Sequence, residues 1–276
     1  MTDGGLIDRR GAEAAMKKPA GSYDLTGEIA VVTGSTGRLG RIWIDALRAA
    51  GATVWGTDTE AAMNGSIFKG VQVGHADITN EREVRELFRL VTSHSGHPPT
   101  ILVNNAGIDS RPSMTDYDAM ALAMVKVNLI GTDLMTRVFG AAMAEAGKGS
   151  IINLASLYGM VVPDLRYYDH RDDGWVKDPM YGATKAGVIQ LTRYYAAKWG
   201  AQGVRVNALA PGGVVASADG LTAQDPQFAA KYTSRIPMQR MCLPEDIGGP
   251  LVFLASQASS FVNGQTIAID GGYLCW

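Results

Sequence analysis

The fold of this 276-residue chain is decided by Glu28-Ile29-Ala30-Val31-Val32-Thr33-Gly34-Ser35-Thr36-Gly37-Arg38-Leu39-Gly40. The first six residues form an apolar, β-branched run typical of a buried strand, and residues 39–50 follow with the period of a helix. Glycines at such a junction allow a tight turn, let the backbone approach a pyrophosphate and leave the N–H groups of the helix N-terminus free to bind it. We therefore predict nucleotide binding at this first βα turn, in preference to an ordinary glycine turn.

Beyond this junction, short apolar runs alternate with helical periods up to the C-terminus, without a Pro- or Ser-rich linker. The predicted strands are Glu28–Thr33, Thr53–Thr57, Val71–His75, Ile101–Asn104, Ser150–Leu154, Val204–Leu209 and Thr266–Ile269. The predicted helices are Leu39–Ala50, Glu81–Ser93, Tyr117–Ala144, Met180–Trp199 and Pro244–Ala255. Strands joined by helical crossovers run parallel and are covered on both faces. We predict one α/β domain over residues 24–276, a Rossmann-type doubly wound parallel sheet of seven strands.

Composition and charge restrict the function classes. With 46% hydrophobic and 19% charged residues, the chain has the profile of a soluble globular protein. Its net charge of −2 creates no global attraction for nucleic acid or an anionic membrane, so we expect a small-molecule ligand. Cys242 and Cys275 form no disulfide framework and no metal-ligand spacing with the four histidines, so we predict no metal site. The charged residues 1–23 predict a flexible leader on a cytoplasmic protein.

The residues after the second and third strands bear on the cofactor. Asp58 lies 18 positions past Gly40, where a carboxylate accepts hydrogen bonds from adenosine ribose hydroxyls and repels a 2′-phosphate. Its alternative role is to cap the next turn. We predict NAD over NADP, although Arg38 in the glycine loop offers a guanidinium for the extra phosphate. Asp77 and Ile78 are candidates to contact adenine; alternatively, Asp77 or Thr79 caps the following helix.

Two further junctions carry chemistry. Asn104-Asn105-Ala106-Gly107 places small residues and amides where a cofactor would lie on the sheet edge, the alternative being a plain turn. Tyr181 and Lys185 are spaced i, i+4 and share one helix face. An ammonium, helped by an oxidised nicotinamide, would lower the phenol pKa from about 10 so that the phenolate takes a proton from an alcohol. Ser156, just after the fifth strand, would hold the reacting oxygen.

In order and spacing, these motifs resemble the short-chain dehydrogenase/reductase family, mostly of its classical type, over about residues 24–273. The resemblance implies Tyr181 as acid/base, Ser156 as the group that orients the substrate, Lys185 as the residue that holds the ribose, and Asn128 as the support of a proton-relaying water. It also implies that backbone at Pro211, Gly212 and Val214 meets the nicotinamide carboxamide. The full set of predicted cofactor residues is Gly34, Thr36, Arg38, Leu39, Gly40, Asp58, Asp77, Ile78, Asn105, Ala106, Gly107, Tyr181, Lys185, Pro211, Gly212 and Val214.

The chain departs from this family pattern at three places. Arg38 stands where the usual loop has its middle glycine, and Ala216 stands where the family usually has threonine. Ser156 and Tyr181 are 25 residues apart, about twice the family's typical spacing, so residues 157–179 contain an insert. Its aromatic, Arg, His and Asp side chains suit a hydroxyl-rich substrate. The alternative, a solvated flap or an oligomer contact, stays open.

The sequence thus predicts an NAD-dependent oxidoreductase that interconverts a secondary alcohol and a ketone on a sugar, sugar acid or polyol. The alternatives are an NADPH-dependent ketone or 3-oxoacyl reductase and a non-catalytic dinucleotide sensor. Family resemblance implies a homodimer or homotetramer, formed through the helices at 117–144 and 180–199 and the last strand. The apolar tail Tyr273-Leu274-Cys275-Trp276 is predicted to pack on a neighbouring subunit.

Overall fold

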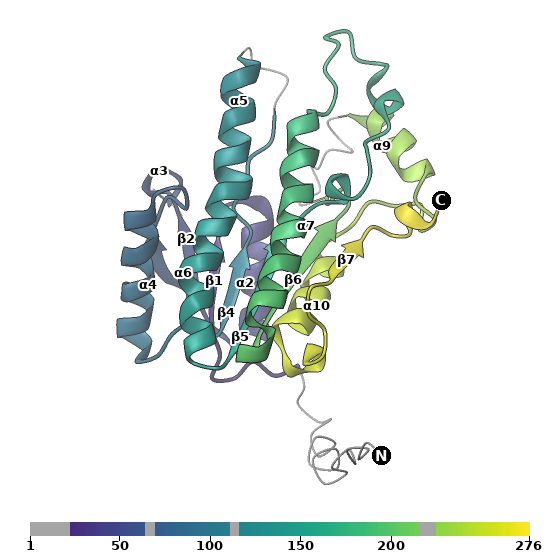
Figure 1. Ribbon diagram of the computed structural model, residues 1–276. Coiled ribbons are helices and arrows are strands. Elements are labelled where there is room, and N and C mark those ends of the chain that lie inside the picture. The colour runs from purple at the N-terminus through teal and green to yellow at the C-terminus, as the bar shows by residue number, and fades with distance from the viewer. Residues whose placement is uncertain (1–22, 64–69, 111–115, 216–224) are drawn as a thin grey trace, which may run out of the picture.

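The computed structural model describes residues 23–63, 70–110, 116–215 and 225–276. Seven parallel strands form one sheet in the order β3-β2-β1-β4-β5-β6-β7 (Figure 1). The strands are β1 (Ile29–Thr33), β2 (Thr53–Asp58), β3 (Gln72–His75), β4 (Ile101–Asn104), β5 (Gly149–Leu154), β6 (Val204–Pro211) and β7 (Thr266–Ile269). The predicted doubly wound sheet is confirmed, and each predicted strand is present within two residues at either end. The predicted leader, 1–23, lies outside the described residues except for its last position.

Helices cover both faces of the sheet. The α-helices are α2 (Arg38–Ala49), α3 (Glu60–Met63), α4 (Glu81–Ser95), α5 (Tyr117–Met124), α6 (Thr132–Glu145), α7 (Pro179–Trp199), α9 (Pro226–Ser234) and α10 (Pro244–Ala255). A π-helix, η1 (Val125–Gly131), joins α5 to α6. Short 3₁₀ turns are η2 (Leu157–Gly159), η3 (Leu165–Tyr168), η4 (Gly200–Gln202), η5 (Gln257–Ser259) and η6 (Tyr273–Cys275).

Alternation along the strands divides the core into two layers. Val32 of β1 packs with α2 and α10, whereas its neighbour Val31 packs with α4, α6 and α7. Both side chains are fully buried, as the apolar run of this strand predicts. Because the parallel strands are held between these layers, their carboxyl ends meet along one edge of the sheet, where the predicted site residues lie.

The predicted helix at 117–144 is interrupted by the π-helix η1. Here i→i+5 bonding widens the helix by one residue, a distortion that sequence periodicity does not reveal. Gly131 ends the wide turn, and an added Cβ there would lie 2.7 Å from Ile78 Cδ1. The continuous stretch Tyr117–Glu145 is apolar and long enough to span a membrane by length and composition alone, and 39% of its most apolar window is buried.

A third cluster of buried residues lies at the carboxyl end of the sheet, over α9 and the insert. No helix is predicted from the sequence between Trp199 and Pro244, but α9 lies there, and its start is marked by Asp225 as N-cap and Pro226 as first helical residue. We call this the aromatic cluster; its rings belong to the insert, to α9 and to the C-terminal turn, and they are Tyr167, Tyr168, Trp175, Phe228, Tyr232 and Tyr273.

The C-terminal tail corrects one prediction. Tyr273 is 1% exposed and packs in the aromatic cluster of its own chain, with its hydroxyl 3.0 Å from Tyr167 Oη. It is therefore not available to a neighbouring subunit, because the insert has already buried it. Trp276, in contrast, is 70% exposed, and its indole N–H donates to Arg235 O (3.1 Å).

Candidate active site

The glycine loop between β1 and α2 is packed against the turn that follows β4. Gly34 has φ +63°, and an added Cβ would lie 2.7 Å from Ala106 Cα. At Gly40 an added Cβ would lie 2.2 Å from Gly34 O. Asn105 closes this contact, since its Nδ2 donates to Thr33 O (2.8 Å) and Gly34 O (3.0 Å). Only glycine fits the loop at these two positions, which suits a turn that brings its backbone against a pyrophosphate.

The first turn of α2 is open to an anion. Its N-cap, Gly37, offers no side-chain cap, and its first turn holds no acidic residue. Such a terminus presents backbone N–H groups and the positive end of the helix dipole. The two predicted cofactor residues that follow differ in burial: Arg38 is exposed, whereas Leu39 packs against the core. The residues present therefore fit a dinucleotide, with its pyrophosphate at this helix.

Asp58, at the end of β2, is fixed beside the glycine loop. Its Oδ2 accepts hydrogen bonds from Thr36 N (3.1 Å) and Thr36 Oγ1 (2.7 Å), and its Oδ1 accepts from Thr59 N (3.0 Å). These three donors fix the orientation of the carboxylate at the position where the Rossmann arrangement places an adenosine ribose. The structure thus brings Thr36 and Asp58 together, as two residues of one predicted site.

Asp77 and Ile78 follow β3. Asp77 Oδ1 accepts from Thr79 N and Thr79 Oγ1, both at 2.8 Å. The N-cap of α4 is Asn80, whose side chain accepts the N–H two residues further on (3.1 Å). The alternative that Asp77 or Thr79 caps this helix is therefore wrong, because Asn80 is its N-cap. Ile78 is 6% exposed and lies under Gly131, and a contact with adenine stays a prediction.

Asn128 fixes the segment after β4 against α7. It is fully buried on η1, where its Oδ1 accepts from Ile108 N (2.8 Å) and its Nδ2 donates to Ile108 O (2.9 Å) and Thr184 Oγ1 (3.2 Å). Its main-chain O accepts from Thr132 Oγ1 (2.8 Å). The side chain is thus committed to backbone and threonine partners, so any support of a water is an additional role that stays a prediction.

The Lys185 ammonium lies near the Asn128 side chain, beside Gly107. Its Nζ donates to Leu154 O (2.7 Å) at the end of β5, and an added Cβ on Gly107 would lie 3.4 Å from this Nζ and 3.3 Å from Asn128 Oδ1. Burial lowers the pKa of Lys185 to about 8; the charge of Lys177 also lowers it and that of Asp109 opposes. The ammonium therefore titrates near neutral pH, within reach of the predicted cofactor residues.

Tyr181 lies in the first turn of α7, two residues after its N-terminal proline. Its pKa is raised to about 12, chiefly by burial and also by the charge of Asp109, whereas a hydrogen bond with Ser156 and the charge of Arg38 act to lower it. Lys185 Nζ lies 5.9 Å from the Tyr181 ring centroid. The predicted lowering of this pKa by Lys185 is therefore not a property of the chain by itself, because burial dominates.

Lys177, in the insert, was not singled out from the sequence. Its Nζ lies 4.3 Å from the Tyr181 ring centroid and 5.9 Å from that of Tyr158, and it pairs with Asp109 from the segment after β4. A cation over an aromatic face is stabilising. A lysine in a long loop gives no sequence signal of such a contact, because the fold alone brings 109 and 177 together.

The segment after β6 is held by backbone contacts. Gly212 N donates to Ile269 O (3.0 Å), Gly213 N to Tyr232 Oη (2.8 Å), and Val214 forms a parallel bridge with Cys242. This fixes the predicted carboxamide-binding backbone beyond Pro211 at the same sheet edge. Ala216, the predicted departure from the family threonine, lies outside the described residues.

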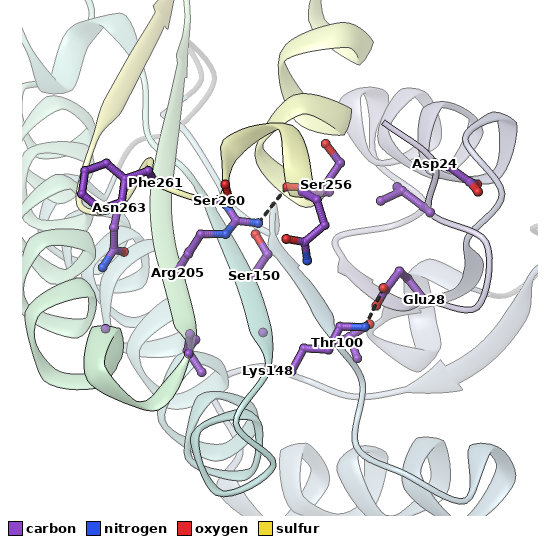
Figure 2. A pocket seen from close by; sticks show the side chains of 17 residues that line it. Asp24, Glu28, Thr100, Lys148, Ser150, Arg205, Ser256, Ser260, Phe261 and Asn263 are labelled. Carbon is purple, nitrogen blue, oxygen red and sulfur yellow. Dashed lines mark hydrogen bonds and ion pairs between the residues drawn. The ribbon is translucent and has the colours of Figure 1, made fainter. Parts of the chain in front are cut away.

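A cavity of about 460 Å³ lies at the opposite edge, at the amino ends of the strands (Figure 2). In Figure 2, Lys148 reaches Glu28, and Arg205 is directed toward the turn at Ser256. Arg205 donates to Leu254 O (2.9 Å) and Ser256 O (3.1 Å), so it anchors the chain after α10. None of the residues that line this cavity belongs to the glycine loop or to α7. Within the described residues, no group of three or more His, Cys, Asp or Glu side chains has the arrangement of a metal site.

Comparisons with known proteins agree with this geometry. Residues 39–274 match the family model described as enoyl-(acyl carrier protein) reductase. Galactitol 2-dehydrogenase of Rhizobium johnstonii is 34% identical over 264 residues, which cover 92% of this chain and 98% of that protein. A gluconate 5-dehydrogenase from Burkholderia cenocepacia, solved with NADP and tartrate, has a TM-score of 0.81 at 28% identity, covering 92% of this chain and 98% of that one. A short-chain dehydrogenase from Leptospira borgpetersenii with bound NAD⁺ has a TM-score of 0.80 at 32% identity, covering 94% and 97%.

Proposed function

The chain belongs to the short-chain dehydrogenase/reductase family, and we propose that it interconverts a secondary alcohol and a ketone on a polyol or sugar with NAD. The observation that carries this proposal is the convergence of Tyr181, Ser156 and Lys185 beside the glycine loop. Oxidoreductase chemistry at CH–OH groups follows from the family and its relatives. A galactitol dehydrogenase among these relatives supports a polyol, and a gluconate dehydrogenase among the solved structures supports a sugar acid.

In the proposed mechanism, four side chains of the site handle the proton and position the groups. A nicotinamide, when bound, would accept the hydride that leaves the carbinol carbon. Ser156 donates a hydrogen bond to the reacting oxygen, and Tyr181 takes the hydroxyl proton of the alcohol. Lys185, cationic below a pKa of about 8, stabilises the phenolate and holds the ribose. Asn128 keeps the segment after β4 and the start of α7 in register with these groups.

NAD rather than NADP is proposed on the position of one charge. The Asp58 carboxylate lies at the loop beside Thr36, where a 2′-phosphate would meet a like charge. Arg38, the cation of the same loop, has an exposed side chain at the first residue of α2. The Asp58 carboxylate supports NAD, whereas the neighbours with known structures bind either NADP or NAD⁺.

Two alternatives have less support. An NADPH-dependent ketone or 3-oxoacyl reductase would need a cation in place of Asp58 at the ribose. A dinucleotide sensor would need no acid/base pair, yet Tyr181 and Lys185 share one face of α7. The protein is further proposed to be a cytoplasmic homodimer or homotetramer of single-domain subunits spanning residues 24–276.

Reduction of NAD and of NADP across polyols, sugars, sugar acids and simple secondary alcohols tests this function. We expect reduction of NAD by at least one polyol or sugar, with kcat/KM at least tenfold higher than for NADP. Turnover only with NADP would refute the cofactor assignment. NAD binding without turnover of any alcohol or ketone would favour the sensor.

A further inference from the structure

An ion pair closes one side of the site beside Tyr181. Lys177 comes from the insert and Asp109 from the segment after β4, so the pair joins two segments that are 68 residues apart. The Lys177 side chain is 15% exposed and that of Asp109 is 38% exposed, which leaves the pair within reach of a ligand. Because Lys177 Nζ lies 4.3 Å from the Tyr181 ring, a substrate whose carbinol meets the phenol would also meet this pair.

The pair keeps hydrogen-bonding capacity of both kinds. In the described part of the chain, Lys177 Nζ donates to Asp109 Oδ2, and Ser110 N donates to Asp109 Oδ1 (2.8 Å). An ammonium has three donors and a carboxylate about four acceptor positions. A donor-rich group and an acceptor-rich group in contact match a vicinal diol, in which one hydroxyl accepts from the ammonium and its neighbour donates to the carboxylate.

We propose that Lys177 and Asp109 form a diol subsite that selects neutral polyols over sugar acids. The inference rests on the proposed function, because it assigns a substrate class to that same site. A neutral diol leaves the balanced charge of the pair unchanged, whereas the carboxylate of a sugar acid would meet the like charge of Asp109. A further anion would also oppose ionisation of Tyr181, whose pKa the Asp109 charge already raises.

Matched substrates that differ only in charge test the subsite. We would measure kcat/KM with NAD for galactitol against galactonate, and for arabinitol against arabinonate, in the wild type, Asp109→Asn and Lys177→Gln. The wild type is expected to prefer each polyol at least tenfold. Asp109→Asn, which is nearly isosteric, should move that ratio at least tenfold toward the acid, because the acid then faces Lys177 alone. Lys177→Gln should raise the KM for the polyol at least tenfold.

A second readout separates recognition from folding. Asp109→Asn removes the charge that raises the pKa of Tyr181, so in a folded variant the rise of alcohol oxidation with pH should move to lower pH, whereas a loss of folding would lower the rate without this move. The control is Asp169→Asn, which removes the ion pair of the same insert with Lys231 on α9. Its polyol-to-acid ratio should equal that of the wild type.

The outcomes separate the subsite from the function. A wild type that prefers the sugar acid, or an unchanged ratio in Asp109→Asn with normal NAD binding and thermal stability, overturns the diol subsite while the dehydrogenase function stands. Turnover of neither substrate class by the wild type overturns the proposed function as well.

Discussion

At the scale of single residues, Tyr181 and Lys185 have opposite shifts with one cause. Burial disfavours the charged form of each, so it raises the pKa of the phenol to about 12 and lowers that of the ammonium to about 8. In the chain by itself, Tyr181 is therefore protonated over the whole neutral range. Without cofactor, Tyr181 is therefore a proton donor. For alcohol oxidation, its pKa must be lowered by the charges that substrate and cofactor add.

This predicts an asymmetric pH dependence. Oxidation needs the Tyr181 phenolate and the Lys185 ammonium, so log kcat/KM for the alcohol should rise from pH 6 to about pH 8 with a slope approaching about one per pH unit. Above the Lys185 pKa of about 8 it should level off, because the loss of the ammonium offsets the gain of the phenolate. Reduction of the ketone needs the protonated phenol and should not rise over that range. Initial rates in both directions across the pH range check this. An oxidation rate independent of pH would mean that Tyr181 is not the base.

Gly40 provides a second residue-scale prediction. An added Cβ would lie 2.2 Å from Gly34 O and 2.8 Å from Ser35 Cα, both backbone atoms that cannot move without opening the loop. Gly40→Ala should therefore cost about 1–3 kcal/mol of loop packing and weaken NAD binding at least tenfold, measured by titration calorimetry. The control is Gly249→Ala in α10, where an added Cβ meets nothing within 4 Å. Equal NAD affinity in both variants would contradict the role of the loop.

The site residues that could be predicted from the sequence are those placed by their own strand or helix. Asp58, Ser156 and Tyr181 follow strands or share a helix face, so chain order and period are enough to group them. The Lys177–Asp109 pair has no such signal, because it forms only where the insert crosses the segment after β4. The burial that raises the pKa of Tyr181 likewise leaves no signal in the motif spacing, which shows only the neighbouring ammonium.

At the scale of elements, the insert is a packed structural element. Residues 157–179 form two 3₁₀ turns, and their rings enter the aromatic cluster. The insert is joined to α9 through His170 Nε2, 2.8 Å from Asp225 Oδ1, and through an ion pair between Asp169 and Lys231. The predicted solvated flap is thus not what forms, because apolar burial and ion pairs both order the segment.

Asp225 links α9 to the insert. It caps α9 by accepting from Phe228 N (2.9 Å) and also contacts His170. Asp225→Ala should lose about 0.5–2 kcal/mol of unfolding free energy and raise the substrate KM several-fold without changing the NAD affinity, by denaturant melts and kinetics. Asp116→Ala removes the cap of α5 and serves as the control. A substrate KM that is unchanged in Asp225→Ala would show that the insert does not shape the substrate site.

The strands and long helices were predicted closely. Continuous apolar runs indicate strands buried on both faces, and a 3.6-residue period of apolar residues indicates helices. The helices missed in the described part of the chain are α3 and α9, which are short, and η1, whose π geometry leaves no pattern. The Asp225-Pro226 pair is a start signal that would have found α9.

At the scale of the whole molecule, α5, η1 and α7 expose apolar side chains. Leu122 is 70% exposed, Ile130 52% and Tyr194 58%. Leu122 and Ile130 lie in Tyr117–Glu145, the one helical stretch among the described residues that is long and apolar enough to cross a membrane by length and composition. Its α6 part, however, buries Phe139 and Met143 in the core. An exposed apolar face on packed core helices fits a subunit interface.

We expect the protein to sediment as a dimer or tetramer. A Leu122→Glu, Ile130→Glu double variant should shift it to smaller species, since two carboxylates would be buried on association. Leu90→Glu, at a 46% exposed position on α4, should leave the assembly unchanged. Sedimentation velocity distinguishes these cases. A wild-type protein that sediments as a monomer at micromolar concentration would contradict the proposed interface.

The central claim is that the chain removes a hydride from a carbinol carbon while Tyr181 removes the proton. The most direct measurement follows deuterium from the carbinol carbon of a polyol into the reduced nicotinamide, in the wild type and in Tyr181→Phe. We predict full transfer of label by the wild type, and in Tyr181→Phe a rate about 10²- to 10⁴-fold lower with NAD binding retained. Unlabelled reduced nicotinamide, or Tyr181→Phe turning over at the wild-type rate, would contradict the account.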